Sequence, residues 1–194
     1  RRRQRQMCIR DRRISDHLPK TQKYLPKQRL WYIRANEVLI SSGSIERPLV
    51  FGNNDTPGVM LSSAAKEYMK VYGVLVGKKP LIFTNNDSGY ETAIEFKKNG
   101  VNPIILDTRS NPSSDIITEA KNLNIEIKFS YVVVAAKGYK KVKSADIAKI
   151  SDDKKELFNI ENIECDCICV SGFWTPSIHL ASQSGNKLKY EEKI

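Results

Sequence analysis

The sequence lacks several features that would assign it to a functional class directly. No apolar run approaches the roughly 20 residues of a membrane-spanning helix, and no apolar core follows the basic N-terminus as in a secretory signal. Only two histidines occur, and the spacing yields no Ser/His/Asp set, paired-carboxylate motif or P-loop. Internal repeats and low-complexity tracts are also missing. We therefore expect a soluble globular protein whose spacing alone reveals no catalytic set.

The four cysteines do not form a disulfide framework. Cys8 stands alone near the N-terminus, whereas Cys165, Cys167 and Cys169 alternate in the run CDCIC. Alternate residues share one face of a strand, so we expect these three thiols along a single surface. Zinc ligands usually come as two pairs, which makes a metal site the weaker alternative. The pattern favours small buried side chains in a reducing cytoplasm.

The net charge of +10 is concentrated at one end. The stretch RRRQRQMCIRDRR carries +6 and leaves +4 for the rest of the chain. It uses Arg where the rest prefers Lys, lacks apolar periodicity and resembles translated sequencing-adapter sequence. We treat residues 1–13 as a non-native or disordered basic leader; the alternative is a native arm for RNA or lipid. Without it, we expect neither nucleic acid nor a membrane as a partner.

The chain after the leader alternates between strand and helix patterns. RLWYIRA and NEVLISSG predict a hairpin or meander that ends in a strand. A helix is expected from Ser62, as its cap, to about Tyr72, with Gly73 as its end. KKPLIFT, GYETAIEFKKNG and VNPIILDT then predict a strand, a helix and a second, parallel strand.

Further elements complete an α/β lobe. We expect a helix from Pro112 to about Leu123, capped by Ser110 or Asn111, and antiparallel strands in IEIKFSYVVVAAKGYKKVKSADIAKI that cover the sheet. ECDCICVSG predicts a buried strand and TPSIHLASQ a short helix. The region from about Thr56 to Ile160 is thus expected to fold as a doubly wound, Rossmann-like unit.

The turn after the first strand of this unit has the place of a dinucleotide fingerprint but not its glycines. On the G-x-G-x-x-G frame the three positions are Thr84, Asn86 and Gly89, so only the third glycine remains. Side chains at the first two positions should crowd a pyrophosphate, although Asn85, Asn86 and Ser88 can still donate hydrogen bonds to another anion. Asp107 ends the second strand, where we expect a solvated cap rather than a ribose ligand.

Three separated motifs carry a family resemblance. They are VLISSGSIERPLVFGNNDTPGVML, FTNNDSGYETA and CDCICVSGFWTPSIHLASQSGNKLKY. The first resembles the segment where pyridine-nucleotide-disulfide-type oxidoreductases pass from their first to their second dinucleotide-binding domain. Together, in this order, the three resemble the alpha subunits of multi-subunit sarcosine oxidases.

The resemblance implies a set of cofactor-binding residues. Ser41, Ser42 and Gly43 stand where the family has its Ala/Ser-Thr-Gly turn beside the cofactor, and a backbone there has no room for Cβ. Arg47 follows in the next loop and can neutralise a phosphate or pair with Glu46; both alternatives stay open. Gly172 matches the glycine that returns the chain to the first domain.

The resemblance also implies an incomplete two-dinucleotide-binding-domain fold. Residues 14–55 would end the first domain, 56–160 would form the second lobe, and 161–194 would return to the first. The whole enzyme would oxidise sarcosine to glycine at FAD on a beta subunit and pass electrons to FMN at the alpha–beta interface. Oxygen would become hydrogen peroxide, and the one-carbon unit would go to tetrahydrofolate. NAD would bind the alpha subunit, and gamma and delta subunits would complete a cytoplasmic assembly. This stretch alone is expected to hold no cofactor.

Other readings remain open. The alternative within the enzyme class is a sister alpha subunit of an opine oxidase, a cyanide-forming glycine oxidase or a proline dehydrogenase, which share the lobed fold and the loop. A non-catalytic scaffold lobe that binds only the beta subunit is the alternative from a different class.

Overall fold

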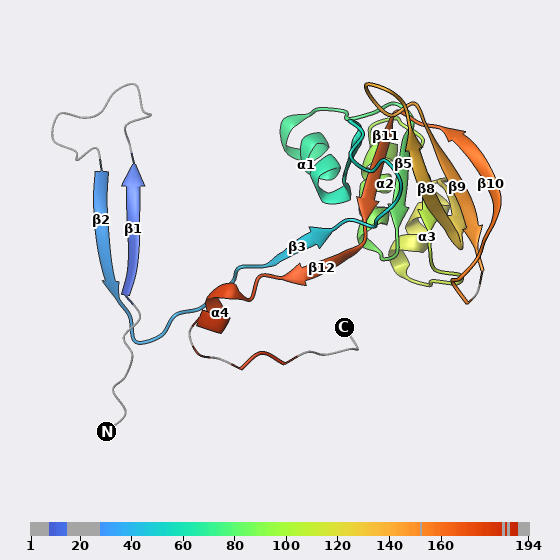
Figure 1. Cartoon of the computed structure of the whole chain (residues 1–194). Helices are drawn as coiled ribbons and strands as arrows, with labels where there is room; N and C mark the ends of the chain where they lie inside the picture. Colours follow the sequence, from blue (N-terminus) through green and yellow to red (C-terminus); the bar gives the residue numbers. More distant parts are fainter. Residues whose placement is uncertain (1–7, 15–27, 152, 184, 186, 190–194) are drawn as a thin grey trace. The chain divides into compact units, whose positions relative to one another are not determined.

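The computed structural model describes residues 8–14, 28–151, 153–183, 185 and 187–189 (Figure 1). The chain divides into two compact units. The first comprises Arg1–Ser42 and Ile178–Ile194, and the second is Gly43–Ser177. The chain therefore crosses between the units twice, at Ser42–Gly43 and at Ser177–Ile178.

The described part of the first unit contains one antiparallel strand pair and one short helix. Strand β1 (Cys8–Ile14) pairs with β2 (Gln28–Arg34), and α4 spans His179–Gln183, which confirms the expected short helix. The strand expected in RLWYIRA is present, but the second strand expected in NEVLISSG is not, because residues 35–43 have no strand partner. Leu39 accordingly remains 95% exposed. Part of the predicted leader, from Cys8, lies in β1, and residues 1–7 lie outside the described residues.

The second unit is built on a five-stranded parallel sheet. Its order is β4-β11-β5-β6-β7. The strands are β4 (Val59–Leu61), β5 (Pro80–Thr84), β6 (Ile104–Asp107), β7 (Glu126–Phe129) and β11 (Cys167–Ser171). The expected strand–helix–parallel strand unit is confirmed in β5 and β6. Strand β11, expected to return to the first domain, instead lies between β4 and β5, so the lobe extends beyond both boundaries expected from the sequence.

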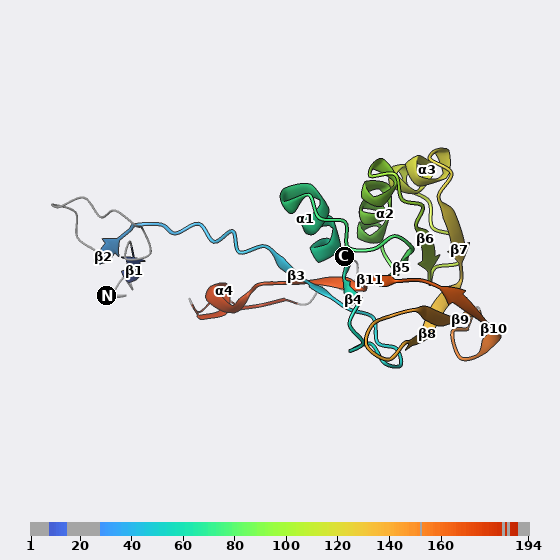
Figure 2. The same cartoon turned by 90° about the horizontal axis from the view of Figure 1, so that it is seen from above.

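Three helices cover one face of this sheet (Figure 2). They are α1 (Ser62–Tyr72), α2 (Ser88–Lys98) and α3 (Asp115–Asn122). Helix α1 ends at Gly73 as expected, with a φ of 62°. Its N-cap position is Leu61 rather than Ser62, and α3 begins three residues after Pro112, because Ser114 is still extended. Tyr90, Phe96 and Ile105 lie in the core between the helices and the sheet.

An antiparallel sheet covers the other face. It consists of β8 (Tyr131–Lys137), β9 (Ser144–Ile150) and β10 (Leu157–Glu164), in the order β10-β9-β8. Leu81, Phe83 and Leu106 of the parallel sheet pack against Val133 and Ile147 of this layer. The expected covering strands are confirmed, but Glu126–Phe129 joins the parallel sheet. The lobe is therefore not doubly wound, since strands rather than helices cover its second face.

The three alternating cysteines do not share one surface. Cys167 and Cys169 lie in the core on the helix side, with their Sγ atoms 3.6 Å apart, whereas Cys165 lies in the core on the antiparallel side. The carboxylate of Asp166 accepts hydrogen bonds from the backbone N–H groups of Lys78 and Lys79, and β11 begins only after it. This bend interrupts the period of two before Cys167. All three thiols are free and buried, which confirms the burial expected from the sequence.

Candidate functional site

A two-stranded ribbon connects the predicted site residues of the second unit. Strand β3 (Ser44–Arg47) pairs antiparallel with β12 (Phe173–Pro176). The ribbon begins where the Gly172 N–H donates to the Arg47 carbonyl oxygen at 2.8 Å, and it closes where the Ser177 N–H donates to the Gly43 carbonyl oxygen at 2.9 Å. A Cβ on Gly172 would lie 2.6 Å from the Arg47 carbonyl oxygen, so only glycine permits this approach.

Backbone conformation, and not the expected lack of space, explains why a glycine occupies position 43. Its φ is +65°, in the left-handed region that favours glycine. A Cβ added there would meet no described atom within 4 Å. Conformation rather than crowding therefore accounts for this glycine within the described chain. Ser41 and Ser42 precede it and are exposed.

Arg47 and Glu46 point to opposite faces of the ribbon. Glu46 is only 4% exposed and accepts a hydrogen bond at Oε2 from the Ser63 N–H, at 2.9 Å. Arg47 is exposed, and its Nε donates to Thr175 Oγ1 at 3.1 Å. Of the two alternatives left open by the sequence, the structure thus disfavours an Arg47–Glu46 ion pair. It leaves the guanidinium on the outer face.

The turn after β5 is filled by its own side chains. Thr84 is fully buried, and its hydroxyl donates to the Asn86 carbonyl oxygen and accepts from the Asn86 N–H. A Cβ on Gly89 would lie 2.7 Å from the Thr84 Cβ, so this glycine lets α2 pack on β5, as expected. The threonine at the first fingerprint position thus occupies the inside of the turn.

Asn86 ties this turn to the ribbon. Its Nδ2 donates to the Gly172 carbonyl oxygen at 2.8 Å, and its Oδ1 accepts from the Ser88 N–H at 2.8 Å. The amide therefore uses the first N–H group of α2, which in a dinucleotide-binding turn points at a phosphate. These residues do not fit a pyrophosphate in this arrangement.

Asp107 is a buried acceptor rather than the expected solvated cap. It is 0% exposed and accepts from Tyr90 Oη at 2.7 Å and from Arg109 Nη2 at 2.8 Å. Further hydrogen bonds come from the backbone N–H and the Nε of Arg109. The guanidinium also forms an ion pair with Asp87 at 2.8 Å. The prediction of a solvated side chain was wrong because sequence shows the strand end but not the two donors that cover it.

This network shifts two pKa values. Burial, reinforced by the hydrogen bond to Asp107, raises the pKa of Tyr90 well above its ordinary value. Burial alone would lower the pKa of Arg109, but the hydrogen bonds to Asp107 and Asp87 outweigh it and raise that pKa. Both groups stay in their hydrogen-bonding forms at neutral pH. The hydrogen bonds that Asp107 would accept from ribose hydroxyls in a dinucleotide-binding fold are therefore supplied by Tyr90 and Arg109.

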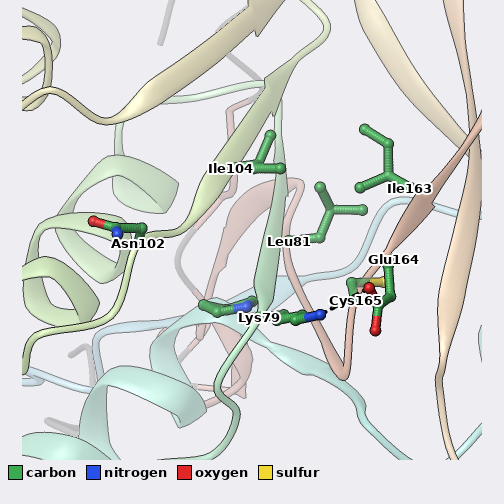
Figure 3. A pocket seen from close by; sticks show the side chains of 8 residues that line it. Lys79, Leu81, Asn102, Ile104, Ile163, Glu164 and Cys165 are labelled. Carbon is green, nitrogen blue, oxygen red and sulfur yellow. Dashed lines mark ion pairs between the residues drawn. The ribbon is translucent and has the colours of Figure 1, made fainter.

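A shallow pocket of about 210 Å³ lies at the opposite, amino edge of the sheet (Figure 3). Its lining is Lys79, Pro80, Leu81, Asn102, Ile104, Ile163, Glu164 and Cys165. Lys79 and Glu164 form an exposed ion pair at 2.7 Å beside it. Burial raises the pKa of Cys165 to about 12, so its thiol is a poor nucleophile at neutral pH. Ligands of parallel sheets bind at the carboxyl ends of the strands, so this pocket is not where a dinucleotide is expected.

The described residues contain neither a metal-ligand cluster nor a membrane-spanning helix. No group of three or more His, Cys, Asp and Glu side chains there is placed to hold a metal ion. None of the helices in that part of the chain has the length and apolar content needed to cross a bilayer.

The sequence is similar to curated proteins of one kind. It is 36% identical over 176 residues to the sarcosine oxidase subunit alpha of Rhizobium meliloti strain 1021, covering 90% of this chain and 17% of that protein. It is 33% identical over 170 residues to the sarcosine oxidase subunit alpha of Corynebacterium sp. strain P-1, with 87% and 17% covered. The chain thus spans about a sixth of the length of these relatives. No family model matches it.

Solved structures share the fold at lower identity. T. acidophilum thioredoxin reductase matches with a TM-score of 0.65 at 19% identity, over 81% of this chain and 51% of that one. The Bacillus anthracis CoADR-RHD structure matches with a TM-score of 0.57 at 12% identity, over 83% and 29%. The fold is therefore the α/β fold of the pyridine-nucleotide-disulfide oxidoreductases. Together with the sequence identity, this shows that the chain is homologous to part of the alpha subunit of sarcosine oxidase.

Proposed function

We propose that this chain is part of the alpha subunit of a sarcosine-oxidising flavoenzyme. The observation that supports this proposal is the identity of 32–36% to three sarcosine oxidase alpha subunits over 87–90% of the chain. In the proposed reaction sarcosine loses its methyl group to leave glycine. The one-carbon unit passes to tetrahydrofolate, and oxygen is reduced to hydrogen peroxide.

The proposed assembly is a cytoplasmic complex with beta, gamma and delta subunits. NAD on the alpha subunit, FMN at the alpha–beta interface and FAD on the beta subunit supply the redox chemistry, and the protein positions them. The second lobe contributes structure rather than a ligand of its own. Its fingerprint turn is closed by Thr84 and Asn86, and the acceptor oxygens of Asp107 are used by Tyr90 and Arg109.

The cofactor contacts of this chain are proposed for residues 41–43 and for the β3–β12 ribbon. Ser41, Ser42 and Gly43 stand at the family's turn position, and Gly43 has a left-handed φ there. Arg47 has its guanidinium on the exposed outer face of the ribbon, where it can neutralise a phosphate. Gly172 lets β12 approach β3 closely enough to hold that face in place.

The test uses the parent coding region, expressed as the complete alpha subunit with its partner subunits. We expect sarcosine-dependent oxygen consumption with formation of hydrogen peroxide. Opines, glycine and proline are the competing substrates of the sister enzymes. A complex that oxidises one of these and not sarcosine contradicts the proposed substrate, and one that oxidises none contradicts the proposed activity.

The residue assignment is tested in the same complex. Arg47→Ala should lower cofactor occupancy, measured as nucleotide and flavin released per complex, because it removes the proposed phosphate partner. Thr175→Val is the matched control, since it breaks the Arg47–Thr175 hydrogen bond but keeps the guanidinium. Equal occupancy in both variants and in the unmodified complex contradicts the assignment of Arg47.

A further inference from the structure

The β3–β12 ribbon is attached to the lobe by side chains as well as by its own chain ends. Both crossings between the two units lie at the end of the ribbon that the Gly43–Ser177 hydrogen bond closes. From the hydrogen bonds of Glu46, Trp174 and Asn86 we infer that the ribbon is a rigid arm. Three side-chain anchors hold it to the N-termini of α1 and α2, so that it moves with the lobe and does not act as a hinge.

The first anchor is Glu46 on α1. The N-cap residue of this helix, Leu61, has no side chain that can accept a hydrogen bond, so the first N–H groups of α1 depend on other partners. Glu46 Oε2 accepts from the Ser63 N–H, the bond that an N-cap side chain ordinarily provides. The positive end of the helix dipole favours a carboxylate there. A residue 17 positions away thus caps α1 and fixes β3 to it.

The second anchor is Trp174 on α2. Its Nε1 donates to Ser88 Oγ at 2.8 Å, and Ser88 is the first residue of that helix. Trp174 lies directly opposite Glu46 in the ribbon register. Directly opposed residues of an antiparallel pair place their side chains on the same face. One face of the ribbon therefore contacts both helices, Glu46 at α1 and Trp174 at α2.

The third anchor is Asn86 at the base of the ribbon. Its Nδ2 donates to the Gly172 carbonyl oxygen, while its Oδ1 accepts from the Ser88 N–H. Ser88 is thus held from two sides, by Asn86 through its backbone and by Trp174 through its hydroxyl. The other face of the ribbon, which carries Arg47 and Phe173, stays exposed. A change in the direction of the ribbon relative to the sheet must break the Glu46 and Trp174 anchors together, because both lie on the strands beyond its base.

Coupling between the anchors provides the test. Glu46→Ala removes the α1 anchor in the 194-residue chain, and the readout is hydrogen exchange of the Trp174 indole N–H, followed by NMR. A rigid arm predicts that this distant exchange becomes about tenfold faster, because losing one anchor loosens the others. Trp174→Phe is the reciprocal variant, and it should accelerate exchange of the Ser63 amide by a similar factor. If Glu46→Ala fails to fold, Trp174→Phe alone tests the inference.

Two controls separate a rigid arm from general loosening. Glu46→Gln keeps an acceptor for the Ser63 N–H and should change the indole exchange by less than about threefold. Thr175→Val breaks the bond to Arg47 on the outer face and should change neither reporter. The inference is overturned if Glu46→Ala leaves the indole exchange at the wild-type rate while the Ser63 amide speeds up. It is also overturned if Thr175→Val loosens both reporters as much as Glu46→Ala does.

Discussion

The two edges of the parallel sheet differ in how their polar groups are used. At the carboxyl edge, Thr84, Asn86 and Asp107 are bonded to neighbouring side chains and backbone groups. At the amino edge, Lys79 and Glu164 form an exposed ion pair beside a shallow pocket. Dinucleotide-binding folds ordinarily bind their ligand at the carboxyl edge. In this lobe, side chains fill that edge.

In this lobe, side chains take the hydrogen-bonding positions that a bound phosphate takes in a dinucleotide-binding turn. A helix N-terminus needs hydrogen-bond acceptors whether or not a phosphate supplies them. Asn86 supplies one at α2, and Glu46 supplies one at α1. The carboxyl edge should therefore carry much more of the lobe's stability than the amino edge. Four substitutions test this contrast.

The largest effect is expected for Asp107→Asn. It removes the charge that the Arg109 guanidinium faces and leaves a buried amide among donors, so the free energy of unfolding should fall by about 3–5 kcal/mol. Urea denaturation followed by circular dichroism measures it. A loss below about 1 kcal/mol would show that Asp107 is an accessible cap after all.

Asn86→Ala should have the second largest effect. It removes the bonds to Gly172 and Ser88, so we expect a loss of about 2 kcal/mol in the same assay. Asn102→Ala is the matched control at the amino edge, where the Oδ1 atom of this exposed residue accepts a hydrogen bond from Lys97 Nζ. Equal losses in the two variants would remove the distinction between the edges.

Tyr90→Phe should give a smaller and pH-dependent effect. Because burial and the Asp107 hydrogen bond raise the pKa of Tyr90, the folded protein keeps this proton at pH values where the unfolded chain loses it. The stability from this phenol is complete below about pH 10 and is lost as the pH rises further. At pH 8 the variant should be about 1–2 kcal/mol less stable than wild type, and the gap should narrow above pH 10. A gap that widens there would reverse the predicted sign.

The smallest effect is expected for Glu164→Gln at the amino edge. Its partner Lys79 is exposed, and such pairs contribute less than about 1 kcal/mol. We expect a change within about 0.5 kcal/mol that disappears in about 0.5 M salt, roughly three times physiological ionic strength. A loss comparable to that of Asn86→Ala would mean that both edges stabilise the lobe equally.

Local sequence patterns predict the individual strands, helices and tight turns, but they do not predict contacts between segments that are distant in the sequence. The strand–helix–strand unit and the packing role of Gly89 follow from short patterns around Leu81–Lys98. The Asn86–Gly172 and Glu46–Ser63 bonds do not, because the fold must first bring these segments together. The same limit explains Cys165, whose face depends on the Asp166 bend.

The position of β11 was missed for a related reason. Its buried pattern is equally typical of a strand in either lobe, and only the pairing with β4 and β5 assigns it to the second. Of the predicted cofactor-binding residues, the structure brings Gly43, Arg47 and Gly172 into one ribbon. Their contact with a cofactor remains a proposal.

The most direct test of the closed turn is a titration of the 194-residue chain with NAD⁺ and NADH, followed by the amide signals of Asn85 to Gly89. Because Thr84 and Asn86 fill this turn, we expect no saturable shift of these signals at ligand concentrations up to about 1 mM, a range in which intact sites bind measurably. The Thr84→Gly, Asn86→Gly double variant reopens the turn and provides the comparison. A saturable shift in the unmodified chain that Asn86→Trp abolishes would contradict the account, since the native turn would then accept a dinucleotide.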